Sequence, residues 1–404
     1  MAGNTPSKIA FLTAGGLAPC LSASIGALIR RYEELAPDTE MIGYLHGYRG
    51  LLQGSRISFS RTVRDQADSL LKFGGSPIGN SRVKLTNQED CVRRGLVKQG
   101  QNPVEVAAGQ LLEDGVTVLH TIGGDDTNTM AGKLLDYVDS QGHSLTVVGL
   151  PKTVDNDVIP ITQTLGAWTA AEQGAVFFEN VANENTTSTR QLIIHEVMGR
   201  HCGWLTAATA HRYRERLEKK TFLPEILLAR ERWDVDAVYV PELPIDMGRE
   251  TERLMERMDA KDGVNIFLGE GAGIDTIIAE MEGAGEEVER DPFGHVKLDT
   301  LNPGQWFAER FAGELKAEKV LVQKSGYFAR SAAPNERDLD LIVRSADMAA
   351  QVALEGRSGV VGLDDERDQV LGLIDFSRIK GGKPFDTGQS WFRDMLTEIG
   401  QNPV

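Results

Sequence analysis

Two short apolar runs, each ending in a cluster of carboxylates, constrain this chain more than any other feature. VTVLHTI (116–122) leads into GGDDTN (123–128), and SLTVVGL (144–150) leads into PKTVDND (151–157). Apolar runs of this length, bounded by glycine or proline, are typical of buried parallel strands. Ligands of open α/β sheets bind beyond the carboxyl ends of such strands, so both acidic segments are expected to border one site. Carboxylates beside the amides of a helix start suit a magnesium-bound phosphate compound, which indicates phosphoryl transfer.

Each part of this pattern also has a purely structural interpretation. Gly123 and Gly124 could turn the chain while Asp125 caps the next helix, and the segment 155–157 could form an Asx turn. Lys152 could be a solvent-facing loop lysine. The occurrence of both segments at successive strand ends favours a functional site. The chain has no GxxxxGK[ST] motif, and GEGAGI (269–274) lacks the dinucleotide-binding spacing.

Composition excludes several classes of protein. The formal net charge of −16 argues against a nucleic-acid partner. Three widely spaced cysteines predict neither a disulfide framework nor a zinc site. We expect no membrane association, because the chain shows neither a signal-peptide core nor an apolar run long enough to span a bilayer, and we expect a cytoplasmic location.

Strand-like and helix-like segments alternate along the chain. The first half predicts strands at 8–14, 41–45, 116–122 and 144–150, and helices at 23–35, 103–113 and 129–138, with Ser22 as a possible cap of the first helix. The second half predicts strands at 190–197, 235–243, 264–271, 320–326 and 359–363, and helices at 170–184, 200–210, 248–258 and 335–356. This alternation predicts two similar Rossmann-like α/β lobes with mostly parallel sheets and an active site in the cleft between them.

The expected division into domains follows from this pattern. Residues 1–158 would form a phosphoryl-donor domain, completed by about 331–375, and 159–330 a sugar-phosphate domain. The polar, turn-rich stretch 282–304 would be a surface insertion, and 376–404 a C-terminal segment.

The order of seven motifs resembles that of the phosphofructokinase family over residues 8 to about 335. The motifs are LTAGG (12–16) with Ala18–Pro19, GNSR (79–82), GGDD (123–126), PKTVDND (151–157), EVMGRHCG (196–203), VPE (240–242) and GYFAR (326–330). Within that family, ATP-dependent members typically carry GGDG and PGT, whereas pyrophosphate-dependent members carry GGDD and PKT. This chain has Asp126 and Lys152, so the resemblance implies reversible phosphoryl transfer from pyrophosphate to fructose 6-phosphate.

The resemblance also implies roles for residues on the donor side. Asp155 would be the general base that takes the proton from the sugar 1-hydroxyl, with Asp157 orienting the site and Thr153 contacting the phosphoryl group or the sugar. Asp125 would hold Mg²⁺. Gly15, Gly16 and Arg82 would bind the donor, together with Lys152 and Asp126. The Asp126 carboxylate would exclude a nucleotide α-phosphate by bulk and charge, and Lys152 would neutralise charge on the phosphoryl group.

On the sugar side, the matching residues are Met198, Gly199, Arg200 and Glu242 for the ring and its hydroxyls, and Tyr327 and Arg330 for the 6-phosphate. Glu242 and Tyr327 could otherwise be ordinary strand-end residues. His195 and His201 are interpreted as structural histidines.

Some residues depart from the family pattern. Leu17 and Cys20 alter the first phosphate loop, and Gln191, beside Arg190, stands where ATP-dependent relatives send an arginine across the subunit interface. Lys324 is a candidate for the second such cation. The resemblance nevertheless implies a homodimer or homotetramer with active sites near the subunit interfaces.

Rival interpretations remain at this stage. The chain could be an ATP-dependent phosphofructokinase, although GGDD and PKT argue against it. An NAD or lipid kinase could share the GGD motif, but would not need the sugar motifs. A catalytically inactive sugar-phosphate sensor would not need an intact TVDND.

Overall fold

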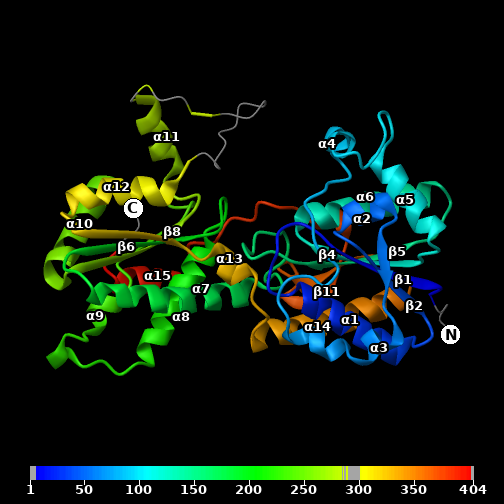
Figure 1. Ribbon diagram of the computed structural model, residues 1–404, viewed down its shortest axis with the longest axis horizontal. Coiled ribbons are helices and arrows are strands. Elements are labelled where there is room, and N and C mark those ends of the chain that lie inside the picture. Colours follow the sequence, from blue (N-terminus) through cyan, green and yellow to red (C-terminus); the bar gives the residue numbers. More distant parts are fainter. Residues whose placement is uncertain (1–5, 284, 286–287, 290–300, 402–404) are drawn as a thin grey trace. The chain divides into compact units, whose positions relative to one another are not determined.

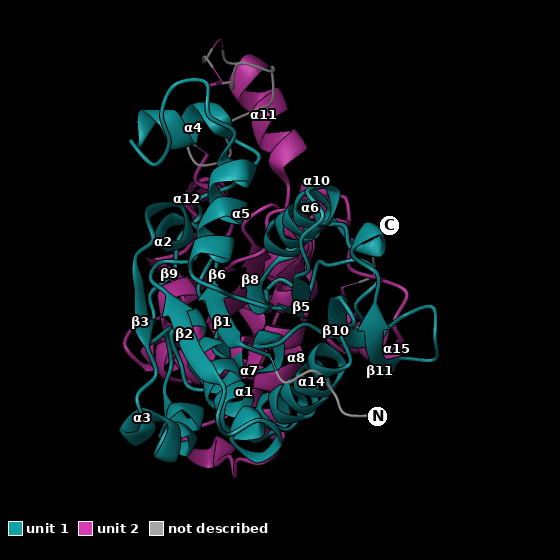
Figure 2. Ribbon diagram, turned by 90° about the vertical axis from the view of Figure 1, so that its right-hand side faces the viewer, with its two compact units in different colours: residues 1–169, 330–383 teal, residues 170–329, 384–404 magenta. Residues whose placement is uncertain are grey.

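The computed structural model describes residues 6–283, 285, 288–289 and 301–401. The chain divides into two compact units, residues 1–169 with 330–383 (unit 1) and residues 170–329 with 384–404 (unit 2), which Figure 2 colours separately. The expected donor domain falls inside unit 1, and most of the expected sugar-phosphate domain falls in unit 2. The expected C-terminal segment 376–404 is divided between the units.

Unit 1 is built on a seven-stranded sheet with the order β11-β10-β5-β4-β1-β2-β3. Neighbouring strands are parallel from β10 to β2, and the two edge strands β11 and β3 are antiparallel to their neighbours. The strands are β1 (Lys8–Thr13), β2 (Glu40–Tyr44), β3 (Arg56–Ser58), β4 (Val118–Gly123), β5 (Thr146–Pro151), β10 (Gly359–Asp364) and β11 (Val370–Ile374).

Helices cover both faces of this sheet (Figure 1). One face carries α1 (Leu21–Leu35) and α14 (Glu336–Leu354), and the other carries α2 (Tyr48–Gln53), α5 (Pro103–Glu113) and α6 (Asp125–Ser140). Leu12 and Val147 of the sheet share one buried cluster with Leu111 of α5 and Leu134 of α6. Three shorter elements lie in the loops: α3 (Arg61–Asp65), η1 (Ala67–Lys72) and α4 (Gln88–Arg93).

The predicted cap of the first helix was wrong. Helix α1 begins at Leu21, so Ser22 already lies in its first turn, and Cys20 occupies the cap position without a side-chain bond to the helix amides. The Ser22 hydroxyl instead donates to the carbonyls of Gly75 (3.0 Å) and Gly74 (3.3 Å), which ties the helix to that loop.

Unit 2 contains a four-stranded parallel sheet with the order β7-β8-β6-β9. The strands are β6 (Gln191–Val197), β7 (Ala237–Tyr239), β8 (Gly263–Gly269) and β9 (Lys319–Lys324). Helices α7 (Ala167–Val181), whose first residues belong to unit 1, and α8 (Trp204–Glu218) cover one face. Helices α10 (Met247–Lys261) and α12 (Pro303–Glu314) cover the other, and α11 (Ile274–Gly283) packs on α12 (Figure 1). The smaller elements are η2 (Ala182–Thr186), η3 (Pro224–Ile226), α9 (Arg230–Trp233), α13 (Gly326–Arg330) and α15 (Ser390–Glu398), with η4 (Phe376–Arg378) in unit 1.

The predicted fold class of two α/β lobes with mostly parallel sheets is confirmed, although the two sheets differ in strand number. The strand predicted at 235–243 was too long, because β7 ends at Tyr239 and leaves 240–242 in the following turn. Most of the predicted insertion at 282–304 lies outside the described residues. Within the described part of the chain, no helix combines the length and apolar character required to cross a membrane.

Candidate active site

The two acidic segments start at the same edge of the unit 1 sheet. Strands β4 and β5 are neighbours, and their register pairs Gly123 with Pro151. Helix α6 begins directly at Asp125, so the amides of its first turn lack intrahelical partners and carry the positive end of the helix dipole. The loop after β1 reaches the same edge, because the Ala14 amide donates to the Ile122 carbonyl (3.1 Å). Three strand ends therefore present glycines, carboxylates and free helix amides together.

The turn that follows β5 is held by Asn156. Its backbone is left-handed (φ 58°), and its carboxamide oxygen accepts from the amide (2.8 Å) and hydroxyl (3.1 Å) of Thr164. The Asp155 amide donates to the Thr153 hydroxyl oxygen at 3.1 Å. Burial alternates along the turn: Thr153, Asp155 and Asp157 are half-buried, whereas the residues between them are buried. Three of the four residues predicted to be catalytic, Thr153, Asp155 and Asp157, are thus the accessible ones of this turn, whereas the fourth, Lys152, is buried.

Lys152 lies inside unit 1, which excludes the solvent-facing interpretation. Its side chain is buried, and Nζ donates to the Gly16 carbonyl at 2.6 Å. Burial lowers the pKa of Lys152 to about 8, while the nearby Asp155 and Asp157 carboxylates oppose that shift and Arg82 adds to it. One ammonium group therefore interacts with the first glycine loop, the PKTVDND carboxylates and Arg82.

Gly15 is required beside this lysine. Its φ of +88° is left-handed, and a Cβ added there would lie 3.1 Å from Lys152 Nζ. The Gly15 amide donates to the Ser81 carbonyl (2.9 Å), which brings the GNSR loop alongside. A Cβ on Gly16 would lie 3.8 Å from Arg82 Nη2. Gly15, Gly16 and Arg82 therefore lie close together beside Lys152.

Asp125 and Asp157 repel one another. Burial raises the pKa of the Asp157 carboxyl, and the charge of nearby Asp125 raises it further, against a hydrogen bond from Thr153 that lowers it. The loop at Gly381 packs directly against Asp125, since a Cβ on Gly381 would lie 2.0 Å from Asp125 Oδ2. The described residues contain no group of three or more His, Cys, Asp or Glu side chains that could enclose a metal. Two carboxylates fit Mg²⁺, which usually completes its shell with water and substrate phosphate oxygens.

Asp126 has a partner that the sequence analysis missed. Its carboxylate pairs with Lys84 Nζ at 2.5 Å, and both side chains are about half exposed. Lys84 stands two residues after Arg82, so the GNSR motif extended to 84 was a signal that could have identified it. The ion pair reduces the negative charge that Asp126 alone would present to a donor.

In unit 2, three of the sugar motifs meet. Glu242 accepts from the Gly203 amide (2.9 and 3.1 Å) and from the Phe385 amide (2.8 Å). Gly199 has φ +121°, and a Cβ there would lie 2.4 Å from the Cys202 carbonyl oxygen. Met198 packs on α13, since a Cβ on Gly326 would lie 3.0 Å from the Met198 sulfur. MGRHCG, VPE and GYFAR are therefore contiguous.

The charged and aromatic sugar-side residues are more accessible. Arg200 is exposed and lies 3.4 Å from Glu270. Tyr327 is 79% exposed on α13, and Arg330 ends the same helix. Phe385 is a contributor that sequence reasoning missed, because it acts through its backbone amide and no side-chain pattern marks it.

The expected replacements for the cross-subunit arginines do not stand free on the surface. Arg190 is bonded to Asp259 (2.7 Å) and to the Leu315 carbonyl (2.6 Å). The Gln191 side chain is fully buried in strand β6, which is paired on both sides, so it presents no group at the surface of this chain. Lys324 pairs with Glu196 at 2.8 Å.

His195 is structural, as interpreted from the sequence. It is buried beside Phe178 and bonded to Ser325 at 2.7 Å, and burial lowers its pKa to about 3. An imidazole that stays neutral and enclosed in this way supports the core of unit 2.

Comparisons with known proteins agree with this geometry. The phosphofructokinase family model matches residues 8–353. The chain is 58% identical to the pyrophosphate–fructose 6-phosphate 1-phosphotransferase of Methylomonas methanica, covering 98% of this chain and 97% of the relative. It is 56% identical to the enzyme of that name from Propionibacterium freudenreichii, over 98% of each. An ATP-dependent 6-phosphofructokinase of Streptomyces coelicolor is 28% identical over 87% of this chain and 89% of the relative.

The comparison with solved structures shows the same fold. The crystal structure of a pyrophosphate-dependent phosphofructokinase from Marinobacter aquaeolei superposes with a TM-score of 0.68 at 20% identity, covering 98% of this chain and 92% of that one. The family model spans most of the chain. The chain therefore belongs to the phosphofructokinase family.

Proposed function

We propose that this chain catalyses reversible transfer of a phosphoryl group from pyrophosphate to the 1-hydroxyl of D-fructose 6-phosphate, giving fructose 1,6-bisphosphate and phosphate. The observation that carries the proposal is the placement of Lys152. It is buried, bonded to the Gly16 carbonyl (2.6 Å), and close enough to Asp155 and Asp157 for their charges to affect its pKa. Relatives that are 56–58% identical over nearly their whole length bear this activity in their names.

Unit 1 supplies the donor site in this proposal. Gly15 and Gly16 allow pyrophosphate to approach the backbone, Arg82 pairs with its oxygens, and Lys152 neutralises charge on the transferring and leaving groups. Asp126, through its bulk and its fixed pair with Lys84, occupies space that a nucleotide donor would need. Catalysis by positioning and charge stabilisation is what phosphoryl transfer requires.

The acceptor chemistry falls to the PKTVDND turn. Asp155 takes the proton from the sugar 1-hydroxyl, Asp157 orients the site, and Thr153 contacts the phosphoryl group or the sugar. Asp125, with Asp157 beside it, would hold Mg²⁺, which would supply positive charge for the phosphate oxygens. The like-charge repulsion that raises the pKa of Asp157 supports a cation at this point.

Unit 2 supplies most of the sugar site, since Arg330 at the end of α13 is counted with unit 1. Met198, Gly199, Arg200 and Glu242 hold the ring and its hydroxyls, while Tyr327 and Arg330 hold the 6-phosphate. The amides of Gly203 and Phe385 fix Glu242 as an acceptor for sugar hydroxyls, because an oriented carboxylate binds them without a further ordering cost.

The test is product formation with pyrophosphate and with ATP, each with and without Mg²⁺, in wild type and Lys152→Met. We expect Mg²⁺-dependent turnover with pyrophosphate, little with ATP, and a large loss in the variant. Preference for ATP would establish the ATP-dependent alternative. Binding of fructose 6-phosphate without turnover on either donor would establish a sensor.

We further propose that the chain is a cytoplasmic homo-oligomer, a homodimer or homotetramer with active sites near subunit interfaces. The support is the family resemblance. Light scattering of the purified chain should give at least twice the chain mass of 44.2 kDa, and activity should fall on dilution to monomers. A fully active monomer refutes this proposal.

A further inference from the structure

The C-terminal segment 384–401 contacts the structure around Glu242 at both of its ends. At its start, Phe385 is buried and its amide donates to Glu242 Oε1 at 2.8 Å. At its end, the Gln401 carboxamide bonds both backbone groups of Val238 in β7: Oε1 accepts from the Val238 amide (2.8 Å), and Nε2 donates to the Val238 carbonyl (3.1 Å). Strand β7 leads directly into the turn that carries Glu242.

Strand β7 needs such a partner because it is an edge strand of only three residues. It pairs with β8 alone, so its outer side would otherwise present unpaired peptide groups. Val238 is 1% exposed, so water does not satisfy those groups in place of Gln401. The Gln401 side chain, itself buried, therefore acts as the missing neighbouring strand at this one position.

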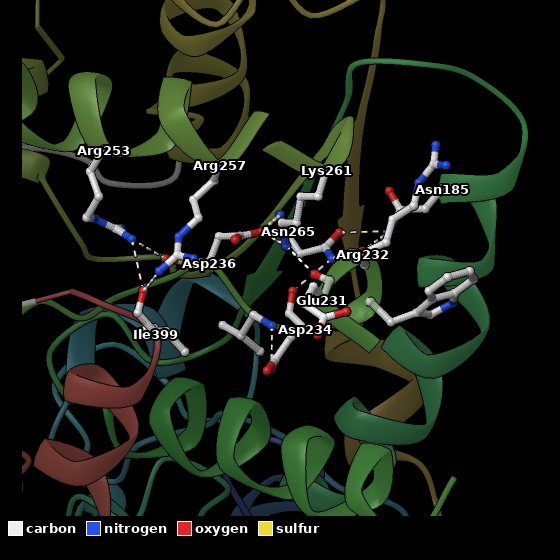
Figure 3. A network of polar contacts seen from close by, with 12 residues as sticks. Asn185, Glu231, Arg232, Asp234, Asp236, Arg253, Arg257, Lys261, Asn265 and Ile399 are labelled. Atoms are coloured by element: carbon white, nitrogen blue, oxygen red, sulfur yellow. Dashed lines mark hydrogen bonds and ion pairs between the residues drawn. The ribbon is translucent and has the colours of Figure 1, made fainter. Parts of the chain in front are cut away.

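The backbone that presents Gln401 is held by a polar network. Figure 3 shows Arg253 and Arg257 of α10 reaching the carbonyl of Ile399, at 3.4 and 3.1 Å. Arg253 also donates to the carbonyl of Asp236, the residue before β7, at 2.8 Å. Gly400 then turns the chain with φ +72°, and a Cβ there would lie 2.9 Å from Arg257 Nη2. Arg253 thus holds both the start of β7 and the chain that leads to Gln401, and Arg257 supports the second of these.

The other end of the segment is anchored by aromatic packing. The Phe385 ring lies 5.0 Å from Phe392 and 5.7 Å from Trp391, both in α15. Trp391 in turn lies 5.1 Å from His211 of α8. Helix α8 follows Gly203, whose amide also donates to Glu242. The C-terminal segment and the MGRHCG loop therefore bind the same carboxylate.

We propose that Gln401 is a positioning residue for the sugar-phosphate site, acting through β7 and Glu242. This inference rests on the proposed role of Glu242 in binding fructose 6-phosphate. If β7 loses its outer partner, the turn at 240–242 loses its fixed starting point, and Glu242 samples orientations that do not match the sugar hydroxyls. The consequence is weaker sugar binding, with pyrophosphate binding preserved.

The test uses the full chain with Gln401→Met, which keeps the side-chain length and removes both hydrogen bonds. We expect KM for fructose 6-phosphate to rise about tenfold, as the loss of two hydrogen bonds allows, and KM for pyrophosphate to stay within about twofold. Gln401→Glu keeps the acceptor for the Val238 amide but sets a carboxylate oxygen against the Val238 carbonyl, so it should also raise this KM. Gln351→Met, an exposed position on α14 in unit 1, is the matched control and should behave as wild type.

A double-mutant cycle separates positioning from general stability. If Gln401 acts through Glu242, adding Gln401→Met to Glu242→Gln should raise KM for fructose 6-phosphate little further. Additive effects, or equal changes in KM for both substrates, overturn the proposal. If Gln401→Met does not fold, Gln401→Glu carries the same cycle. A wild type without pyrophosphate activity, or a Glu242→Gln variant with normal KM, would instead refute the proposed function itself.

Discussion

The buried ammonium of Lys152 predicts a pH limit on pyrophosphate use. With a pKa of about 8, roughly nine tenths of Lys152 is charged at pH 7 and about one tenth at pH 9. If the cation binds and stabilises pyrophosphate, kcat/KM for this donor should fall about tenfold per pH unit above that pKa, because kcat/KM reports groups of the free enzyme. Bound pyrophosphate is an anion and favours the charged lysine, so kcat itself should decline at higher pH.

Protein stability should move in the opposite direction. The pKa of Lys152 is lower in the folded chain than in the unfolded chain, where it is about 10.4. The unfolded chain therefore binds more protons between these two values, and the Lys152 contribution to the free energy of unfolding becomes more favourable as pH rises from about 8 to about 10.4. A loss of activity between about pH 8 and 10.4 therefore cannot come from unfolding caused by the titration of Lys152.

The assay is kcat/KM for pyrophosphate from pH 6 to 10 in wild type and Lys152→Met. The ionisation of pyrophosphate and its binding of Mg²⁺ in solution are the same in both assays, so only the difference between the two profiles belongs to Lys152. At pH 7, kcat/KM for pyrophosphate should be about 10²-fold or more lower in the variant than in wild type. The variant's pH profile should also lack the decline that begins near pH 8 in wild type. If both proteins show the same decline, or if the wild-type decline lies near pH 10.4, the assignment of a buried, partly desolvated lysine at the donor site is wrong.

Four further substitutions test individual roles. Asp155→Ser should lower kcat by about 10³-fold while calorimetric binding of fructose 6-phosphate stays near normal, and near-normal turnover would remove it as the base. Arg330→Ala should mainly raise KM for fructose 6-phosphate and Arg82→Ala mainly KM for pyrophosphate; equal effects on both substrates would show that the donor and sugar sides are misassigned. Asp126→Gly should increase ATP use relative to pyrophosphate without a complete switch, because it removes bulk and leaves Lys84 without its carboxylate; an unchanged donor ratio would contradict the exclusion argument.

The elements that the sequence predicted well are those set by local pattern. The helix at 103–113 has the observed bounds of α5, and the apolar runs before GGDD and PKTVDND form the adjacent strands β4 and β5. Their adjacency was predictable because successive parallel strands leave their carboxyl ends at one edge. The motif predicted a role for Lys152 but not its burial. That burial depends on packing against the glycine loop 136 residues earlier in the chain, and no local sequence pattern encodes this contact.

The features that the sequence did not predict depend on contacts between distant segments. Lys84 reaches Asp126 from a loop without periodic structure, and Gly381 approaches Asp125 from a stretch that carries no site motif. Gln191 matched an interface position in alignment, but its place in β6, paired on both sides, buries it. Motif order predicts which chemistry is present, while side-chain exposure depends on packing that only the folded chain defines.

The way the chain passes between its units has a consequence for biosynthesis. The sheet of unit 1 is incomplete until β10 and β11 have been made, because β5 pairs with β10, whose residues follow all four strands of unit 2 in the chain. Until then β5 is an unpaired edge on a growing polypeptide, and such edges invite misassociation. Unit 2 in turn waits for 384–401 to cover β7. Unit 1 cannot complete its sheet until β10 and β11 are made, and unit 2 cannot cover β7 until 384–401 follows. A nascent chain stalled before residue 359 should therefore depend on chaperones far more than the released protein does.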